Sequence, residues 1–242
     1  MSVWEYANPR RFMAVSGRLL PWVAGAAALL CATGIVWGLF FTPEDFRMGH
    51  SVKIIYIHVP SAFVAINAWF MMLVASLIWL IRRHHVSALA ARAAAPIGLV
   101  MTVVALLTGA IWGKPMWGTY WAWDPRLTAF LILGLFYLGY IALWSAIEAQ
   151  DAAADLTSIL CLVGTVFAVL SRYAAQFWNQ GLHQGASLSL DAEENIADVF
   201  WLPLVLAIAG FTLLFLALVL LRTRTEIRRR RLHSLSLKAR LA

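Results

Sequence analysis

The stretch VFWLPLVLAIAGFTLLFLALVLL at residues 199–221 is apolar from end to end and carries no charged side chain. A helix of about 20 apolar residues crosses the hydrocarbon core of a bilayer, where every backbone group must pair within the protein. The stretch therefore predicts a transmembrane helix. Five further runs of comparable length lie at residues 19–41, 58–81, 93–112, 127–147 and 156–177. The sequence predicts an all-α integral membrane protein of six spans, folded as a single domain over residues 1–242.

The composition of the 242-residue chain agrees with this class. Hydrophobic residues make up 62% of the chain and charged residues 13%, about half the charged fraction of a soluble domain, and the mean hydropathy is +0.77. These values exclude a soluble enzyme, a disordered chain and a collagen-like chain. The only cysteines, Cys31 and Cys161, do not form a CxxC motif, which excludes a disulfide scaffold, a cysteine zinc site and a thioredoxin-like redox role.

The distribution of Lys and Arg predicts the topology. An even number of spans places both termini on one side, and 14 of the 19 Lys and Arg residues fall there. The positive-inside rule predicts that both termini are cytoplasmic, and the first span is expected to be an uncleaved signal anchor. We expect the basic cytoplasmic tail at 222–242 to lie against anionic membrane lipid. Binding to nucleic acid is not expected, because no folded basic module accompanies the tail.

Tryptophan is concentrated between the third and fourth predicted spans. The segment 113–126 is predicted to be an outward-facing loop stiffened by prolines, and within or beside it lie Trp112, Trp117, Trp121 and Trp123. Tryptophan favours the membrane interface, which explains Trp112 and one more of these residues. Four in so short a stretch exceed what an interfacial belt requires, and exposed apolar area of this density is typical of a surface that receives a flat ligand or a partner.

Two histidines are predicted at the same outer level as this loop. His58 lies where the second span begins, and His183 follows the fifth span between Gly181 and Gly185. The positive end of a helix disfavours imidazolium, and a neutral imidazole is the form that binds a metal. A single histidine at a membrane edge is usually an ordinary polar residue. Two beside a tryptophan platform favour a haem site, because haem iron accepts axial histidines.

Two cations and one acid accompany these residues. Arg126 and Lys53 are candidates for pairing with the haem propionates, although both could simply mark helix ends. Asp124 has two possible roles. It could orient Arg126 by charge, or it could cap the N-terminus of the fourth span, a position that Asp favours.

Three motifs carry a resemblance to a known family: WGKPMWGTYWAWD at 112–124, YIHVPS at 56–61 and LHQGAS at 182–187. The first resembles the tryptophan-rich WWD signature of haem-handling membrane proteins. Together, over nearly the whole chain, the motifs resemble the CcmC family of the bacterial cytochrome c maturation system.

This resemblance implies a role for the chain in handling haem. It implies that haem b is held transiently on the periplasmic face of the inner membrane, with His58 and His183 as iron ligands and the tryptophan loop as platform. The carried-over basic positions are Arg126 and Lys53, and at Lys53 the family more often has Arg. The implied partners are the haem chaperone CcmE, which receives the haem covalently, CcmD, and the ATP-binding cassette pair CcmA and CcmB.

A transmembrane transport subunit for haem or another flat solute, working with an ATP-binding cassette ATPase, is the alternative. Such a subunit needs a polar path through the membrane, and all the candidate residues are predicted on one face. No general acid, general base or nucleophile is evident among them. The expected contribution of the chain is therefore the positioning of haem, and whether this makes it an enzyme stays open.

Overall fold

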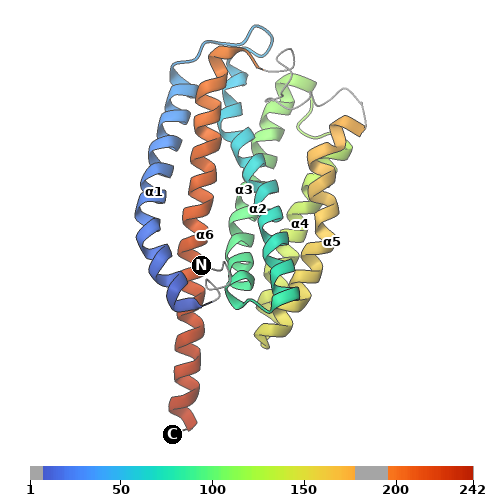
Figure 1. Ribbon diagram of the computed structural model, residues 1–242. Coiled ribbons are helices and arrows are strands. Elements are labelled where there is room, and N and C mark those ends of the chain that lie inside the picture. The colour runs from blue at the N-terminus through green and yellow to red at the C-terminus, as the bar shows by residue number, and fades with distance from the viewer. Residues whose placement is uncertain (1–7, 178–195, 242) are drawn as a thin grey trace.

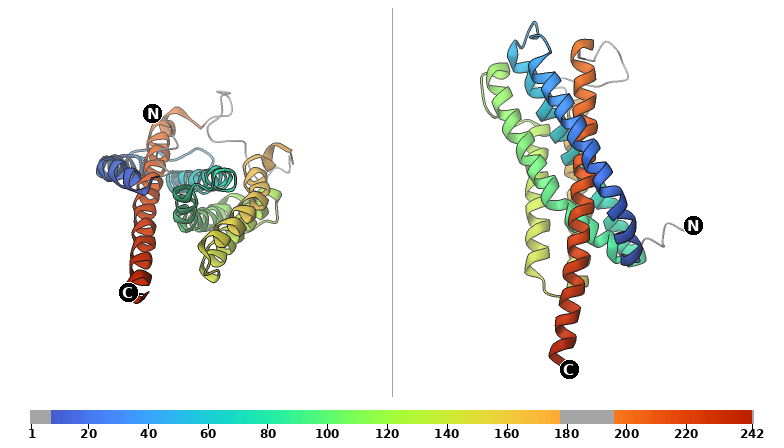
Figure 2. Two further views of the ribbon diagram at one scale, coloured as in Figure 1. Left: turned by 60° about the horizontal axis from the view of Figure 1, so that its bottom comes forward. Right: turned by 90° about the vertical axis from the view of Figure 1, so that its left-hand side faces the viewer.

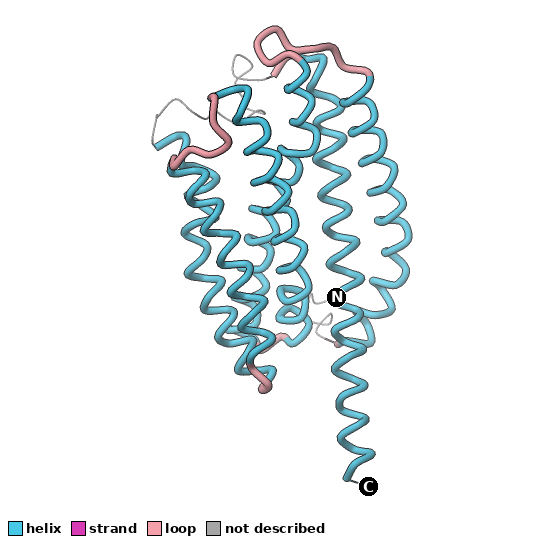
Figure 3. The backbone as a smooth tube through the Cα atoms, turned by 180° about the vertical axis from the view of Figure 1, so that it is seen from behind, coloured by secondary structure: helices cyan, strands magenta, loops and turns pink. Residues whose placement is uncertain are grey.

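The computed structural model describes residues 8–177 and 196–241, and most of these residues are helical. Six helices are long and apolar enough to cross a membrane. They are α1 (Pro9–Phe40), α2 (Ile55–Arg82), α3 (His85–Trp117), α4 (Pro125–Ala146), α5 (Gln150–Phe177) and α6 (Asp198–Leu241), and a short 3-10 helix, η2 (His50–Ile54), precedes α2. The described residues contain no strand beyond an isolated bridge between Asp45 and Gly49, as Figure 3 shows. The prediction of six spans in an all-α protein is confirmed.

The helices form one bundle in which the first and last helices of the chain are neighbours. The contact between α1 and α6 is the most extensive in the molecule, while α2 and α3 occupy the middle and α4 packs on α5 beyond them, as Figure 1 shows. We call the end at which α1 and α3 stop and α2, α4 and α6 begin the site end, and the opposite end the tail end. The start of α1 and the terminus of α6 both lie toward the tail end (Figure 1).

Local sequence signals explain where several helices start and stop. Asn8 accepts a hydrogen bond from the Arg10 amide at 3.0 Å and Pro9 follows it as the first residue of α1, a combination typical of helix N-termini. At the other end of α3, Gly118 takes φ 75° and its amide bonds to the Lys114 carbonyl. Only glycine adopts this left-handed conformation at no steric cost, so α3 stops there.

Two helices end well beyond the residue at which the apolar pattern predicts their C-termini. α3 was expected to end at residue 112, but it continues for five residues through Pro115. Proline removes a single hydrogen bond from the ladder, and the helix persists until the glycine at 118. α6 was expected to end at residue 221, yet it extends to Leu241 and projects beyond the other helices, as Figure 2 shows. At 1.5 Å per residue its 44 residues span about 66 Å.

Tertiary contacts explain why the first part of the basic tail is an extension of α6. The Arg224 guanidinium donates to the Met13 carbonyl at 2.6 Å and to the Ser16 hydroxyl at 2.9 Å, both on α1. Glu226 is buried and pairs with Arg92 of α3 at 3.2 Å. These bonds hold the segment against the bundle, so Arg224 has a structural role in packing α6 on α1.

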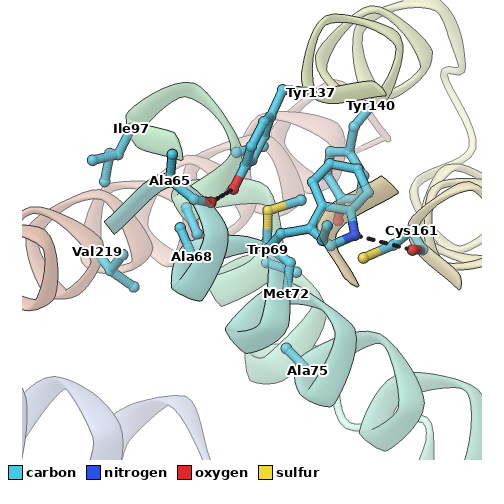
Figure 4. Close-up of a cluster of buried hydrophobic side chains, with 14 of the residues drawn as sticks. Ala65, Ala68, Trp69, Met72, Ala75, Ile97, Tyr137, Tyr140, Cys161 and Val219 are labelled. Atoms are coloured by element: carbon cyan, nitrogen blue, oxygen red, sulfur yellow. Dashed lines mark hydrogen bonds between the residues drawn. The ribbon is translucent and has the colours of Figure 1, made fainter. Parts of the chain in front are cut away.

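The core of the bundle lies between α2, α3, α4 and α5. Trp69 of α2 is completely buried and meets the Tyr137 ring edge to face at 4.7 Å. Their polar atoms are paired: the Trp69 indole donates to the Cys161 carbonyl at 3.3 Å and the Tyr137 hydroxyl donates to the Ala65 carbonyl at 2.7 Å, as Figure 4 shows. Cys161 lies in this core and Cys31 in α1, and both thiols are free.

Candidate functional site

His58 lies at the site end, on α2, where its ring meets one face of α3. Its Nδ1 atom lies 3.0 Å from the Thr108 hydroxyl oxygen. Its ring approaches that of Trp112 edge-on, with 5.8 Å between ring centroids. Thr108 and Trp112 are four residues apart on α3, so they lie on the same side of the helix. The structure therefore brings one predicted ligand into contact with the first tryptophan of the tryptophan-rich segment.

Gly109 leaves space on α3 for the imidazole ring of His58. A Cβ atom at this position would lie 3.0 Å from the Cε1 atom of His58, closer than ordinary van der Waals contact. The absence of a side chain therefore lets the ring lie against the α3 backbone. Neither Thr108 nor Gly109 was predicted to contact His58. Their spacing from Trp112 on one helix face was the available signal, but nothing in the chain indicated that His58 would face them.

His58 itself lies deeper in its helix than the motif suggested. The second span was expected to start at residue 58 with Pro60 in its first turn, but α2 begins at Ile55, directly after η2. His58 is thus the fourth residue of α2, and Pro60 lies within the helix. The 3-10 turn at 50–54 extends the helical path outward, which the apolar pattern could not reveal because this segment contains His50 and Lys53.

The tryptophan-rich segment is divided between a helix and a short loop. Trp112 and Trp117 belong to α3, and the loop covers only residues 118–124 before α4 begins. Within it, the rings of Trp121 and Trp123 meet edge to face at 5.5 Å, and Trp123 is 78% exposed. The indole N–H groups of Trp112 and Trp121 are buried and find no acceptor among residues 8–177 and 196–241. They are donors placed beside an exposed aromatic surface.

Asp124 caps α4, which is one of the two roles that the sequence left open. Its carboxylate accepts a hydrogen bond from the Leu127 amide at 2.6 Å, and Pro125 starts the helix. The side chain is buried. Asp124 also lies near enough to Arg126 to act on its charge, together with Arg172 of α5. The guanidinium groups of Arg126 and Arg172 therefore lie near each other at the start of α4. The Asp124 carboxylate beside them already accepts a hydrogen bond from a backbone amide.

Lys53 faces the first helix. Its ammonium group donates to the Leu39 carbonyl in the last turn of α1 at 2.9 Å. A cation at a helix C-terminus satisfies an unpaired carbonyl and interacts favourably with the helix dipole. Of the two predicted propionate partners, Lys53 thus has a structural task, whereas Arg126 forms no hydrogen bond with any residue in the described part of the chain. His183, the second predicted ligand, lies outside the described residues.

The histidines at the tail end have structural contacts of their own. The Nδ1 atom of His84 accepts a hydrogen bond from the Ser87 amide at 3.1 Å and caps α3. Burial lowers the pKa of His84 below its ordinary value, which keeps the ring neutral and able to accept this bond at pH 7. His85 contacts the Trp79 ring, with 5.3 Å between centroids.

The site end therefore combines groups that suit a large, flat, anionic-edged ligand. It offers an imidazole with a fixed orientation, a cluster of indole rings and two guanidinium groups. Buried indole donors without an acceptor in the described residues would suit the carboxylates on the edge of a porphyrin. The donor set fits haem, for which the aromatic rings could supply walls and the imidazole could supply an iron ligand.

Comparisons with known proteins find relatives of this chain over nearly its whole length. The family model described as "CcmC: Heme exporter protein C" matches residues 2–238. A protein of Rhodobacter capsulatus named "Heme exporter protein C" is 72% identical over 242 residues, covering all of both chains. A protein of the same name from Paracoccus denitrificans is 70% identical over 97% of each chain. The one from Escherichia coli K12 is 41% identical over 92% of this chain and 89% of its own length.

Proposed function

Because the chain belongs to the Heme exporter protein C family, we propose that it binds haem at its site end and presents it for covalent attachment to the haem chaperone CcmE. Haem b is the cargo and is held transiently. His58 and His183 are its axial ligands. The site end faces the periplasm, both termini are cytoplasmic, and the protein resides in the inner membrane. CcmD and the pair CcmA and CcmB are its further partners.

One observation carries this proposal: the packing of His58 from α2 against Trp112 of α3. The two residues are more than 50 positions apart in the sequence and come from two separate motifs. A histidine that served only as an interfacial polar group would not need a fixed orientation beside an indole. The other tryptophans, Trp117, Trp121 and Trp123, follow Trp112 in the same segment, and the rings of Trp121 and Trp123 contact each other. Asp124 supports the surface by holding the start of α4.

The chain acts by positioning its cargo. None of the residues assigned here serves as a general acid, a general base or a nucleophile, so rate enhancement in the transfer comes from holding haem in a productive orientation toward the chaperone. The imidazole restrains the iron, the indole rings restrain the plane of the porphyrin, and Arg126 restrains its propionate edge.

The decisive experiment separates presentation from transport. We expect the chain, purified alone in detergent and supplied with haem, to show the absorption spectrum of six-coordinate bis-histidine haem and to load purified CcmE without ATP. Presentation of haem requires only the site end and consumes no ATP. If haem reaches the chaperone only when CcmA, CcmB and ATP are present in a sealed vesicle, the chain is a transport subunit, which is the alternative function.

The charged residues give a second prediction. Changing Arg126 to Ala is expected to weaken haem binding about tenfold to a hundredfold, because a hydrogen bond to a charged group contributes roughly 1.5–3 kcal/mol. Arg126→Lys should restore only part of the loss, since Lys lacks the planar fork that grips a carboxylate with two parallel bonds. Haem titration followed by absorption measures both variants.

Lys53→Ala is the comparison for Arg126. Its ammonium group is engaged by the end of α1, so the variant should lose less haem affinity and show its effect mainly as reduced thermal stability. Equal losses of haem affinity in Arg126→Ala and Lys53→Ala, with unchanged stability in both, would contradict the distinction between them.

A further inference from the structure

A neutral imidazole has two tautomers, and the choice between them decides which nitrogen can bind a metal. With the proton on Nδ1, the lone pair is on Nε2, and with the proton on Nε2 the lone pair is on Nδ1. In His58, Nδ1 is the atom that faces Thr108. The direction of this one hydrogen bond therefore determines whether Nε2 of His58 carries a lone pair or a proton.

The second bond of Thr108 fixes that direction. The hydroxyl oxygen lies 2.7 Å from the Val104 carbonyl oxygen, one turn earlier in α3, and 3.2 Å from the Ala105 carbonyl oxygen. A carbonyl oxygen can only accept, so the hydroxyl proton must point to Val104. The separation of 2.7 Å is typical of O–H···O bonds, and 3.0 Å to His58 is typical of N–H···O bonds.

A hydrogen bond in the opposite direction, from the Thr108 hydroxyl to Nδ1 of His58, would be unfavourable. If the Thr108 hydroxyl donated its proton to Nδ1 of His58, two oxygen atoms with lone pairs would face each other at 2.7 Å with no hydrogen between them. Such a contact is repulsive and leaves the Val104 carbonyl without that donor. The hydroxyl oxygen of Thr108 is therefore the acceptor, and Nδ1 of His58 is the donor.

We propose that Thr108 is a positioning residue that holds His58 in the Nδ1–H tautomer and so directs the Nε2 lone pair toward the bound iron. The tautomer follows from the hydrogen bonds alone, whereas the identity of the metal rests on the proposed function. Metal-binding histidines commonly donate a hydrogen bond from the N–H of their second ring nitrogen to an oxygen atom, which fixes both tautomer and orientation. Here the oxygen belongs to a hydroxyl that is itself anchored to the helix backbone.

Two neighbours restrict the ring further, so that the bond cannot easily rotate away. The Cε1 edge of His58 lies close to the backbone at Gly109, where a Cβ atom would come within 3.0 Å of it, and Trp112 packs against the same ring. Residues 108, 109 and 112 thus form one face of α3 that receives the imidazole. A threonine with a purely structural role in the helix would be satisfied by its Val104 bond and would need no partner on α2.

The first test uses the protein without haem. In apoprotein labelled with 15N at histidine, His58→Gln identifies the His58 signals, and their chemical shifts report which nitrogen is protonated. We expect the Nδ1–H tautomer in the wild type and in Thr108→Ser, which keeps the hydroxyl. Thr108→Val keeps the shape without the acceptor, so this tautomer should lose its preference. An Nε2–H tautomer in the wild type, or a tautomer unchanged in Thr108→Val, overturns the proposal.

The second test measures haem affinity by titration. Thr108→Val is expected to bind haem about 10- to 100-fold more weakly, the usual effect of removing such an outer partner of a metal ligand, and Thr108→Ser should recover most of the affinity. Thr102→Val is the matched control. Thr102 lies on the same helix and makes the same bond to a carbonyl four residues earlier, at 2.8 Å, but it is buried in the bundle away from His58.

The outcomes separate this proposal from the function on which it rests. Wild-type haem affinity in Thr108→Val, with its tautomer altered, would show that the tautomer does not control iron binding and would overturn the positioning role. Equal losses in Thr108→Val and Thr102→Val would assign the effect to helix packing and would also overturn it. Failure of the wild type to bind haem, with the Nδ1–H tautomer present, would refute the proposed function and leave the assignment of the hydrogen bond standing.

Discussion

Replacement of His58 by alanine is expected to abolish six-coordinate haem in the purified protein. The variant loses an axial ligand, and no other histidine of the described residues lies against the α3 face formed by residues 108, 109 and 112. Replacement of His183 by alanine should have the same effect if it supplies the opposite ligand. The absorption spectrum and the haem content per protein, measured on equal amounts of purified chain, report the loss directly.

The variants must also be shown to fold. The ring of His58 contacts Thr108 and Trp112, so its removal should cost about 1–2 kcal/mol of stability and leave the protein in the membrane. His50→Ala is the matched control, because His50 is also at the site end but is 76% exposed and pairs with Glu44, an interaction of small energy. Added imidazole should restore a six-coordinate spectrum to His58→Gly. Wild-type haem content in both ligand variants would refute the assignment.

The other large effect is expected in the contact between α1 and α6. A Cβ atom at Gly34 would lie 2.5 Å from the backbone nitrogen of Ala207 and 2.9 Å from the Pro203 carbonyl oxygen. Backbone atoms cannot rotate aside as a side chain can, so Gly34→Ala must push the two helices apart. We expect a loss of about 1–3 kcal/mol, the usual cost of overpacking, seen as a lower midpoint of thermal unfolding in detergent.

Gly25→Ala provides the matched control within the same helix. A Cβ atom at Gly25 meets nothing within 4 Å, and alanine favours a helix more than glycine does. This variant should be as stable as the wild type or slightly more stable. Similar midpoints for Gly34→Ala and Gly25→Ala would mean that α1 and α6 do not approach as closely as the structure places them.

The six spans could be predicted because each one depends on local composition. A run of about 20 apolar residues has few alternatives in a bilayer, and the caps at Asn8 and Asp124 are likewise signals carried by neighbouring residues. The ends of α3 and α6 could not be predicted in this way. Pro115 suggested that α3 ends near it, but the helix ends just before Gly118. The extension of α6 depends on a contact of Arg224 with α1, more than 200 positions away in the sequence.

The candidate site was predictable in its chemistry and not in its arrangement. The tryptophan-rich segment and His58 differ from ordinary membrane sequence, so they could be singled out by residue type. Thr108 and Gly109 are common residues in a transmembrane helix, and their importance arises only from the way α2 faces α3. Lys53 and Arg126 were both predicted to pair with the haem propionates, yet Lys53 is engaged by the end of α1.

The pairing of the first helix with the last has a consequence for biosynthesis. α1 enters the membrane first, whereas its main neighbour α6 is the last helix to be translated. While the four intervening helices insert, the small-residue face of α1 around Gly34 has only lipid or the insertion machinery to contact, because helix association in a bilayer requires the partner to be present. A chain interrupted before α6 would contain α2 to α5 but leave α1 without its main neighbour. The bundle can therefore close only after α6 has been translated, and we expect membrane proteases to recognise unfinished chains.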